Sequence, residues 1–424
     1  MRLMLRVQVA MVRPSILAFV FGLLCSNAGL ALASEMGPVA LPAVVTSEAA
    51  PLTDGEHSMP VGRRAFESGK LRVDFGAYFQ PGYEYRRDSA FNLDDYDSFA
   101  INNARLKGSS ALEFRPDWTG RFNLDLDVST GVFLSKNIYA SIAWRDSRFA
   151  VDIGQMKVPF LMYDMIPDQG RQIIPGLPLN KLGLGRDRGI RVRGDVPVSG
   201  GQLRYWAGIF HGEGPSVLRN VDNRYVYAGR VVWSPRGNAH DAESDLEGGD
   251  LRGTLGFSTM YTPSLASMEL GPDSRFLEEA RGAIEGTLKF HGFSLRAEGL
   301  YGSVRPGPLT KGFSRYAVWG GAGYVLPWFQ AIPIEPAIRI AQFDFDTSHD
   351  GFVAQPGSAA VYGASDSSAQ RRLDVGVNLY LSGRKLFVNL AWRRVQFLEG
   401  QIYDVGGGPL IGDQFTAYLN LALP

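Results

Sequence analysis

The chain has 424 residues with 43 basic and 43 acidic side chains, so its formal net charge is zero. This balance excludes a strongly basic nucleic-acid-binding protein. Beyond the N-terminus no stretch approaches the ~20 apolar residues of a membrane-spanning helix, which excludes a helical membrane bundle. Gly is abundant (50 residues), aromatic residues make up 12%, and there is one cysteine. This composition favours an exported, strand-rich protein without disulfides.

Residues 1–33 are predicted to be a signal peptide. They combine basic residues, an apolar core and a small-residue cleavage site, which are Arg2, Arg6 and Arg13, residues 16–24, and Ala31-Leu32-Ala33. We expect cleavage before Ser34, because the apolar core is too short to remain as a spanning anchor. Cys25 lies in the removed part, so the mature chain offers no thiol chemistry.

The remaining chain divides into two regions. Residues 34–68 are rich in Pro, Ala, Ser and Glu without periodicity, which predicts a flexible periplasmic N-terminal segment. Residues 69–424 repeat short stretches of alternating apolar and polar residues, as in 121–128 and 373–381. This alternation predicts strands whose polar face carries charges of both signs, as in the wall of a water-filled barrel. The predicted fold is an all-β, 16-stranded antiparallel transmembrane β-barrel.

The strand positions follow from alternation and turn residues. The predicted spans are 71–87, 98–115, 118–130, 136–146, 148–157, 187–197, 200–212, 223–234, 250–263, 280–290, 292–303, 313–326, 331–345, 369–382, 385–398 and 412–423. Short connections such as Pro116-Asp117 and His291-Gly292 alternate with long ones such as 158–186 and 346–368. Bacterial barrels have short periplasmic turns and long outer loops, so this alternation supports the prediction. The acidic connection 235–249 is a long exception among the short turns.

Charged residues alternate with apolar ones in several strands, which predicts that they face the lumen. In Ile190-Arg191-Val192-Arg193 both arginines lie on one face and are expected to face water. The same alternation points Arg105, Lys107, Arg252, Lys289, Arg296, Arg372 and Arg393 inward, together with Asp125, Asp127, Asp152, Glu285, Glu298 and Asp374. Single charges can simply hydrate the wall and pair across strands. As a set, basic residues in a narrow channel select anions.

The third connection of the outer side, residues 158–186, is long but not of low complexity. Such loops are usually functional. It contains Arg171, Lys181 and Arg186 against Asp164 and Asp168. We expect this third extracellular loop to fold into the lumen, which places these charges at the constriction of the pore, and the alternative is a surface loop that only covers the mouth.

Three sequence blocks stand at the ends of predicted strands. They are Phe99-Ala-Ile-Asn-Asn-Ala-Arg-Leu-Lys-Gly108, Ile153-Gly-Gln-Met-Lys-Val-Pro-Phe160 and Arg186-Asp-Arg-Gly-Ile190. They resemble blocks of the phosphate-selective porin O and P family, in which Gly-Gln-x-Lys-x-Pro-Phe precedes an inward-folding third extracellular loop. The resemblance covers about residues 70–424 and implies a sixteen-stranded barrel, a trimer and diffusion of anions such as phosphate. Unlike that family, this chain has few lysines and ends in Leu423-Pro424 rather than an aromatic residue.

The sequence thus predicts a porin in the outer membrane of a Gram-negative bacterium, passing small anions such as phosphate or polyphosphate without a cofactor or metal. Candidate anion-binding residues are Arg105, Lys107, Arg171, Lys181, Arg186, Arg191, Arg193, Arg252, Arg296, Arg372 and Arg393. Expected partners are small anionic solutes, outer-membrane lipid, the outer-membrane assembly machinery and two further copies in a homotrimer, but no nucleic acid. The alternative is a general or differently selective porin of the same fold.

A further alternative is an outer-membrane enzyme or adhesin barrel. The five histidines, His57, His211, His240, His291 and His349, form no metal-ligand spacing. The sequence around His211 is similar to a lipase oxyanion loop, but no Gly-x-Ser-x-Gly accompanies it. Residues 183–189 miss the dinucleotide-binding spacing. We therefore expect no enzymatic activity.

Overall fold

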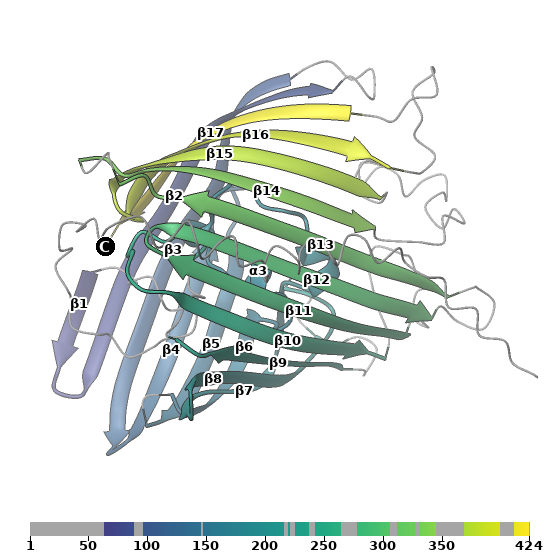
Figure 1. Cartoon of the computed structure of the whole chain (residues 1–424). Helices are drawn as coiled ribbons and strands as arrows, with labels where there is room; N and C mark the ends of the chain where they lie inside the picture. The colour runs from purple at the N-terminus through teal and green to yellow at the C-terminus, as the bar shows by residue number, and fades with distance from the viewer. Residues whose placement is uncertain are drawn as a thin grey trace, which may run out of the picture. The chain divides into compact units, whose positions relative to one another are not determined.

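The structure is a computed structural model (Figure 1). It describes residues 63–88, 96–145, 147–215, 219–220, 225–236, 242–263, 278–305, 312–327, 331–344, 369–398 and 411–423. All described residues belong to one compact unit. The predicted signal peptide and residues 34–62 of the predicted N-terminal segment lie outside the described residues.

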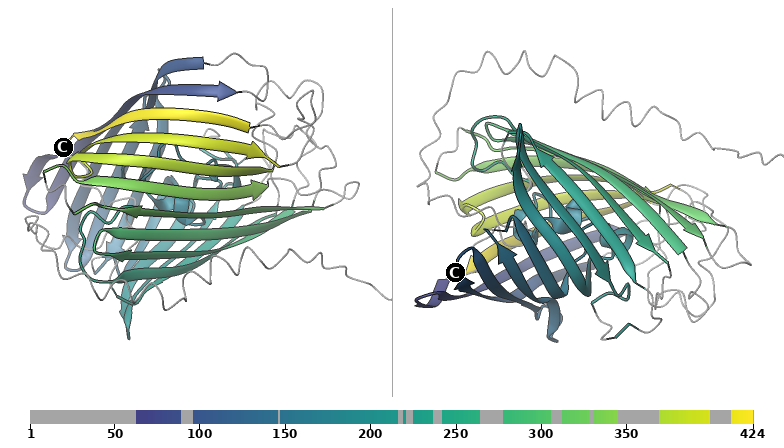
Figure 2. Two further views of the ribbon diagram at one scale, coloured as in Figure 1. Left: turned by 45° about the horizontal axis from the view of Figure 1, so that its top comes forward. Right: turned by 90° about the horizontal axis from the view of Figure 1, so that it is seen from below.

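One antiparallel sheet contains all the described strands. Its sixteen barrel strands are β2 (Leu71–Asp88), β3 (Tyr96–Arg115), β4 (Trp118–Asp127), β5 (Leu134–Trp144), β6 (Phe149–Lys157), β7 (Arg186–Val198), β8 (Gly201–Phe210), β9 (Val226–Ser234), β10 (Arg252–Thr262), β11 (Glu278–Phe290), β12 (Phe293–Arg305), β13 (Phe313–Tyr324), β14 (Ile334–Asp344), β15 (Gln370–Ser382), β16 (Leu386–Phe397) and β17 (Ile411–Leu423). Each pairs with its sequence neighbour, and β17 pairs with β2 through Phe415 and Tyr85, so the sheet closes (Figure 2). The predicted all-β, 16-stranded antiparallel barrel is confirmed, with strand ends shifted by a few residues.

A seventeenth strand, β1 (Arg63–Ser68), lies in the region that the sequence assigned to an aperiodic segment. It pairs with the beginning of β2, from Arg63 opposite Phe75 to Ser68 opposite Leu71. On the same edge of β2, β17 ends with Leu423 opposite Ala77. The strand β1 therefore continues the line of β17 along β2. Six residues are too few to show a clear alternation of apolar and polar residues in the sequence. The strand is recognised from its hydrogen-bonded pairing with β2.

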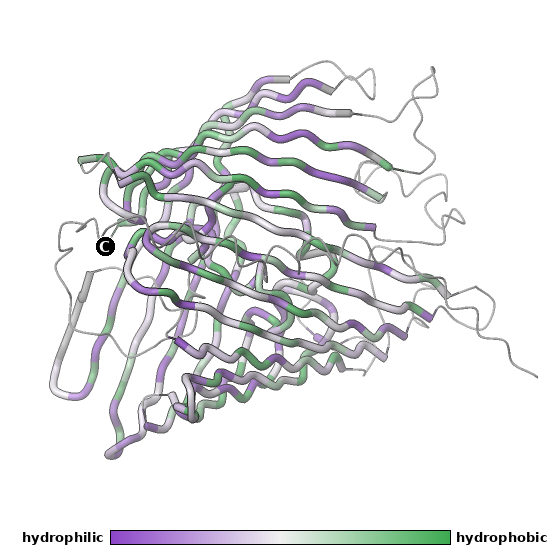
Figure 3. Tube along the Cα trace, in the orientation of Figure 1, coloured by the Kyte–Doolittle hydropathy of each residue, from purple (hydrophilic) through white to green (hydrophobic). Residues whose placement is uncertain are grey.

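The barrel strands are apolar outside and polar inside. In β10 the exposed residues include Leu255 and Phe257, each 59% exposed, whereas Thr254 and Ser258, on either side of this pair, are 3% and 1% exposed. Other strands alternate in the same way, as the hydropathy along the trace shows (Figure 3). Soluble proteins rarely expose a continuous apolar surface of this extent, because its hydration is unfavourable. The outer face is therefore suited to lipid.

Exposed aromatic residues lie near both rims of this outer face. Tyr227, Tyr261 and Tyr301 stand toward the ends of their strands that lead to long connections, and Trp233 and Phe293 stand toward the opposite rim. Aromatic residues near both rims of an apolar outer face are typical of the two interfacial girdles of a membrane barrel.

The two ends of the barrel differ in their connections. Short turns join β3 to β4, β5 to β6, β7 to β8, β11 to β12 and β15 to β16, and this end carries the C-terminal label in Figure 1. We call it the short-turn end. The turn His291-Gly292 has positive φ at both residues (47° and 88°), as expected for a two-residue hairpin. The connections at 235–251 and 325–333 are the longer ones at this end.

The connection between β6 and β7 contains the described helical turns, α3 (Met162–Met165), the 3-10 helix η1 (Asp168–Gly170) and α4 (Asn180–Gly183). Each is about one turn long and has no side-chain N-cap. Among the residues that the structure describes, no helix has the length and apolar character needed to cross a membrane.

Candidate functional site

The connection between β6 and β7 is buried, although connections usually lie on the surface. We call residues 158–185 the long segment. Phe160, Met162 and Leu182 have no exposed surface, and they belong to one apolar cluster with Phe210 of β8 and Phe343 of β14. The long segment therefore packs against inward-facing side chains of the barrel. A buried backbone must find hydrogen-bond partners there, because water is excluded.

The carboxylate of Glu298 on β12 anchors the beginning of the long segment. It accepts hydrogen bonds from the backbone N–H groups of Met162 (2.6 Å) and Tyr163 (3.2 Å). The indole N–H of Trp319 donates a third hydrogen bond to it at 2.9 Å. These bonds satisfy N–H groups of α3 that lie before its first internal hydrogen bond.

Side-chain amides of the wall anchor the middle of the long segment. Asn378 on β15 and Asn389 on β16 both donate to the carbonyl oxygen of Gln172 at 2.9 Å. The Gln172 side chain in turn donates to Glu335 on β14 at 2.6 Å, and Asn389 accepts the N–H of Ile174 at 3.2 Å. Three neighbouring strands thus hold residues 172–174 through buried polar side chains.

Four clusters on the inner wall combine guanidinium groups with carboxylates. The clusters are Asp152 with Arg191 and Arg193 (2.8 Å each), Asp374 with Arg339 and Arg393 (2.7 and 2.6 Å), Glu285 with Arg230 (2.6 Å), and Glu279 with Arg281 and Arg315 (3.7 Å to Arg315). Seven guanidinium groups share four carboxylates in these clusters. Every cluster except the Arg230 pair is therefore net positive.

The same guanidinium groups bind backbone carbonyl oxygens along the long segment. Arg191 donates to the carbonyl of Lys157 at 3.1 Å, directly before the segment. Arg339 and Arg393 both donate to the carbonyl of Pro175. Arg281 donates to the carbonyl of Leu182 near the segment's end. These arginines therefore hold the long segment in place. The same side chains carry the positive charge of the wall clusters.

The expectation that Arg191 and Arg193 face water is wrong. They are 0% and 2% exposed, because the strand face was predicted correctly but the space in front of it is occupied. Asp152 binds both guanidinium groups, and Arg191 also lies 6.0 Å from the ring centroid of Tyr139. Alternation identifies the inner face of a strand but not what stands against it.

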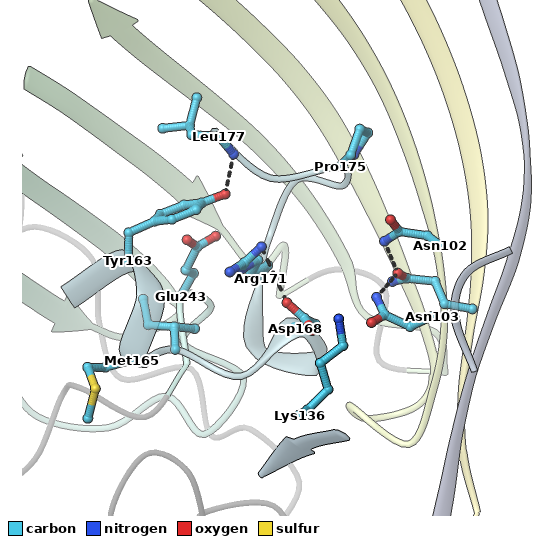
Figure 4. A network of polar contacts seen from close by, with 12 residues as sticks. Asn102, Asn103, Lys136, Tyr163, Met165, Asp168, Arg171, Pro175, Leu177 and Glu243 are labelled. Carbon is cyan, nitrogen blue, oxygen red and sulfur yellow. Dashed lines mark hydrogen bonds and ion pairs between the residues drawn. The ribbon is translucent and has the colours of Figure 1, made fainter. Parts of the chain in front are cut away.

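Arg105 and Arg171 share the carboxylate of Asp168 on the long segment. The distances are 2.5 Å from Arg105 and 3.3 Å from Arg171, and Arg105 also lies 3.6 Å from Asp125. Arg171 stacks 4.5 Å from the ring centroid of Tyr163, and Figure 4 shows it between that ring and Asp168. Burial alone raises the pKa of Asp168, but Arg105 and Arg171 outweigh it and hold the pKa well below its usual range.

The other predicted site residues are spread around the barrel. Lys107 stands opposite Asp125, Arg186 donates to Asn137 (3.0 Å), Arg252 binds Asp245 and Glu247 (2.9 Å to Glu247), Arg296 lines a small internal cavity, and Arg372 donates to Gln370 (2.8 Å). Lys181 is in α4, but its side chain lies outside the described part of the chain. The structure therefore joins Arg191 with Arg193, and it brings Arg105, Arg171, Lys107 and Arg186 within electrostatic reach of Asp168.

Sequence reasoning missed four arginines of the wall clusters, Arg230, Arg281, Arg315 and Arg339. Arg339 stands between Ile338 and Ile340, so the alternation used for Arg191 also predicts that it faces inward. Arg230 and Arg281 alternate less clearly with apolar residues, because small residues flank them. The contacts of Asn378 and Asn389 with the long segment could not be predicted from the sequence. An asparagine on the polar face of a strand is equally compatible with a side chain that faces water.

The carboxyl group of Asp164 in α3 provides a pH test. It is 8% exposed, and its Oδ2 has no hydrogen-bond partner. Burial raises its pKa above the ordinary 3.8 and outweighs the attraction of Arg171, Lys157 and Arg186. The folded state thus holds this proton more tightly than the unfolded state, so stability falls as pH rises through the folded pKa.

We expect Asp164→Asn to raise the thermal unfolding midpoint at neutral pH and to leave it unchanged below pH 3.8, where wild-type Asp164 is protonated in both states. Unfolding followed by circular dichroism at several pH values measures this difference. An equal gain at every pH would show that the carboxylate charge is not the cause.

The described residues contain no group of three or more His, Cys, Asp or Glu side chains that could hold a metal ion. Of the five histidines considered above, His211 and His291 lie within the described residues, in connections at opposite ends of the barrel.

Comparison with known proteins finds similar solved structures. No family model and no curated protein matches the chain. Similar solved structures include the anion-selective porin from Comamonas acidovorans, with a TM-score of 0.55 and 13% identity over 83% of this chain and 100% of that one. They also include the trimer form of the outer-membrane protein OmpT of Vibrio cholerae, with a TM-score of 0.53 and 10% identity over 84% of this chain and 100% of that one. Salmonella typhi OmpF in complex with daunomycin has a TM-score of 0.51 and 10% identity over 84% of this chain and 98% of that one. At these identities the likeness shows a porin-like fold.

Proposed function

We propose that this protein is a porin of the Gram-negative outer membrane, a water-filled channel for the passive diffusion of small anions. The observation that carries the proposal is a set of three clusters on the inner wall of a closed barrel with an apolar outer face, each with two guanidinium groups for one carboxylate. Net positive clusters on a channel wall raise the local concentration of anions and repel cations. The short-turn end then faces the periplasm.

The long segment is proposed to be the constriction of this channel. Its contacts with inward-facing side chains of β12, β14, β15 and β16 support a path through the lumen rather than over the mouth. Apolar packing and carbonyl–guanidinium bonds support a fixed rather than a floating position. A fixed segment inside the barrel narrows the aqueous path and brings passing ions close to the wall charges.

The anion path is proposed to follow the less buried basic residues. Lys107, Arg171 and Arg186 are partly exposed, whereas Arg191 and Arg193 are buried. The buried arginines, together with Arg296, Arg372 and Arg393, contribute a positive potential at longer range. Guanidinium forks suit oxyanions with several oxygens, which supports phosphate-like solutes over halides.

Ion selectivity in planar bilayers tests the proposal. We expect the wild-type reversal potential in a salt gradient to show anion preference, and Lys107→Glu with Arg186→Glu to shift it toward cations. The matched control is Arg72→Glu with Arg145→Glu, which makes the same charge change on side chains that are 53% and 51% exposed. The control is expected to keep the wild-type reversal potential. Equal shifts in both double variants would show that the effect comes from net charge alone.

A general porin with little selectivity is the second candidate. It is favoured by the pairing of wall arginines with carboxylates, such as Asp152 and Asp374, because paired charges produce weaker fields. A wild-type reversal potential near zero would select this candidate. A homotrimer is proposed from the family resemblance of the sequence and from the trimer form of OmpT. No feature of the described residues supports an enzyme or adhesin over a channel.

A further inference from the structure

A second buried segment lies at the short-turn end, between β9 and β10. Its residues 242–250, Ala-Glu-Ser-Asp-Leu-Glu-Gly-Gly-Asp, include four acids and no base, and we call them the acidic segment. Ala242, Glu243 and Asp245 are 2%, 3% and 1% exposed. The neighbouring short turns, such as residues 199–200, are exposed at the same end. A buried turn at the rim of a barrel requires specific partners.

The partners belong to turns on other parts of the rim. Arg384, in the turn from β15 to β16, donates to the carbonyl oxygen of Ser244 and to Glu247, both at 3.1 Å. Asp245 accepts the N–H of Gly292, in the turn from β11 to β12, at 2.9 Å. Four strands separate β10 from β15 in the sheet. A segment bonded at both places must run across the short-turn mouth rather than along its rim.

The acidic segment also contacts the long segment. The N–H of Glu243 donates to the carbonyl of Gly170 at 2.7 Å, and the Glu243 carboxylate accepts the N–H of Gln172 at 2.7 Å. The two segments enter from opposite ends of the barrel, so these bonds join them inside it. Beside them lies a cavity of about 10 Å³, lined by Gln172, Glu243, Arg296 and Arg339 among others, with room for about one water molecule.

We infer that the acidic segment is a second constriction, in series with the long segment, and that its carboxylates weaken the anion preference of the wall. This inference depends on one part of the proposed function, namely that the barrel conducts ions. Its acids Glu243, Asp245, Glu247 and Asp250 face three basic groups, Arg252, Arg384 and Lys289. The acidic segment therefore carries one negative charge more than the bases that face it, whereas three clusters on the wall beyond it are net positive, and an anion meets both fields in turn.

The central experiment replaces residues 238–250 with Asn-Gly. The pairing of Trp233 with Leu255, continued along β9 and β10, places 237 opposite 251, so a two-residue hairpin turn keeps the register. We expect single-channel conductance to rise and the reversal potential to shift toward stronger anion preference. Unchanged conductance in an inserted channel would overturn the inference.

A combined variant tests the series arrangement. Resistances in series add, so removing both of two barriers raises the conductance by more than the product of the two single effects. We therefore expect the Asn-Gly variant, combined with a replaced long segment, to exceed that product. A combined conductance equal to that of the long-segment replacement alone would show that the acidic segment is no barrier.

A point variant tests the charge without altering the turn. Glu243→Gln keeps an oxygen that accepts the Gln172 N–H and removes the negative charge. The matched control is Asp117→Asn at the same end, where the side chain is 57% exposed and φ is 66°, which asparagine tolerates. We expect Glu243→Gln alone to shift the reversal potential toward anions, and equal potentials in both variants would contradict the role of this carboxylate.

These outcomes separate the inference from the proposed function. A wild type that conducts without anion preference removes the proposed anion selectivity, while a conductance rise in the Asn-Gly variant still supports a second constriction. If the wild-type channel carries little current and the Asn-Gly variant conducts well, the second constriction is supported most directly. A wild type and a variant that both fail to conduct, although inserted, would overturn both.

Discussion

Replacing residues 160–183 with Gly-Ser-Gly-Ser is expected to raise single-channel conductance several-fold. Lys157 and Arg186 are paired neighbours on β6 and β7, so a short linker joins these strands without changing their register. The replacement removes buried apolar residues of the proposed constriction, including Phe160 and Leu182, and a wider path passes more ions. The wall clusters keep their own ion pairs, such as Asp374 with Arg393, so the barrel should persist.

The measurement is conductance in a planar bilayer at high salt, where screening reduces the influence of charge and the width of the path decides the current. The unheated electrophoretic mobility of the variant checks that the barrel is folded. A folded, inserted variant with wild-type conductance would show that the long segment does not constrict the pore.

Arg191→Glu combined with Arg193→Glu is expected to abolish the folded barrel. The variant gathers three carboxylates, with Asp152, at a place where both arginines are almost fully buried. Losing a buried ion-pair partner alone costs about 3–5 kcal/mol, and the added repulsion of like charges increases this. Arg191 also loses its bond to the carbonyl of Lys157, so the long segment is released.

The amount of folded protein in the outer-membrane fraction measures this effect. Arg72→Glu with Arg145→Glu is the control, since it makes the same charge change on exposed side chains and should fold normally. An inserted Arg191→Glu, Arg193→Glu barrel with a shifted reversal potential would instead favour arginines that face the water of the pore.

The barrel could be predicted from the sequence because its signals are local. Each strand carries its own alternation, as residues 373–381 do, and lipid and the lumen impose it on every strand. Turn residues such as His291-Gly292 fix the hairpins by their backbone preferences. Strand β1 escaped prediction because its six residues need β2 to become a strand.

The contents of the lumen could not be predicted in the same way. The sequence places Arg191 on the inner face, but its role depends on Asp152 and on the carbonyl of Lys157, 39 and 34 residues away. The bonds from Asn378 and Asn389 to Gln172 span 206 and 217 residues. Such partners leave no periodic pattern, because they are set by which connection enters the barrel. The length and acidity of 235–249 marked the acidic segment as unusual without indicating its position.

The pairing of β17 with β2 has a consequence for how the barrel forms. Tyr78 on β2 donates to Asn420 on β17, 342 residues later, at 2.9 Å, so these strands meet only when nearly the whole barrel domain has been assembled. Contacts of such long sequence separation form late, because ordering the intervening chain costs entropy. Until then β2 and the last assembled strand are open edges that can pair with other chains. A chain shortened by its last strand would therefore yield an open, aggregation-prone sheet rather than a narrower channel.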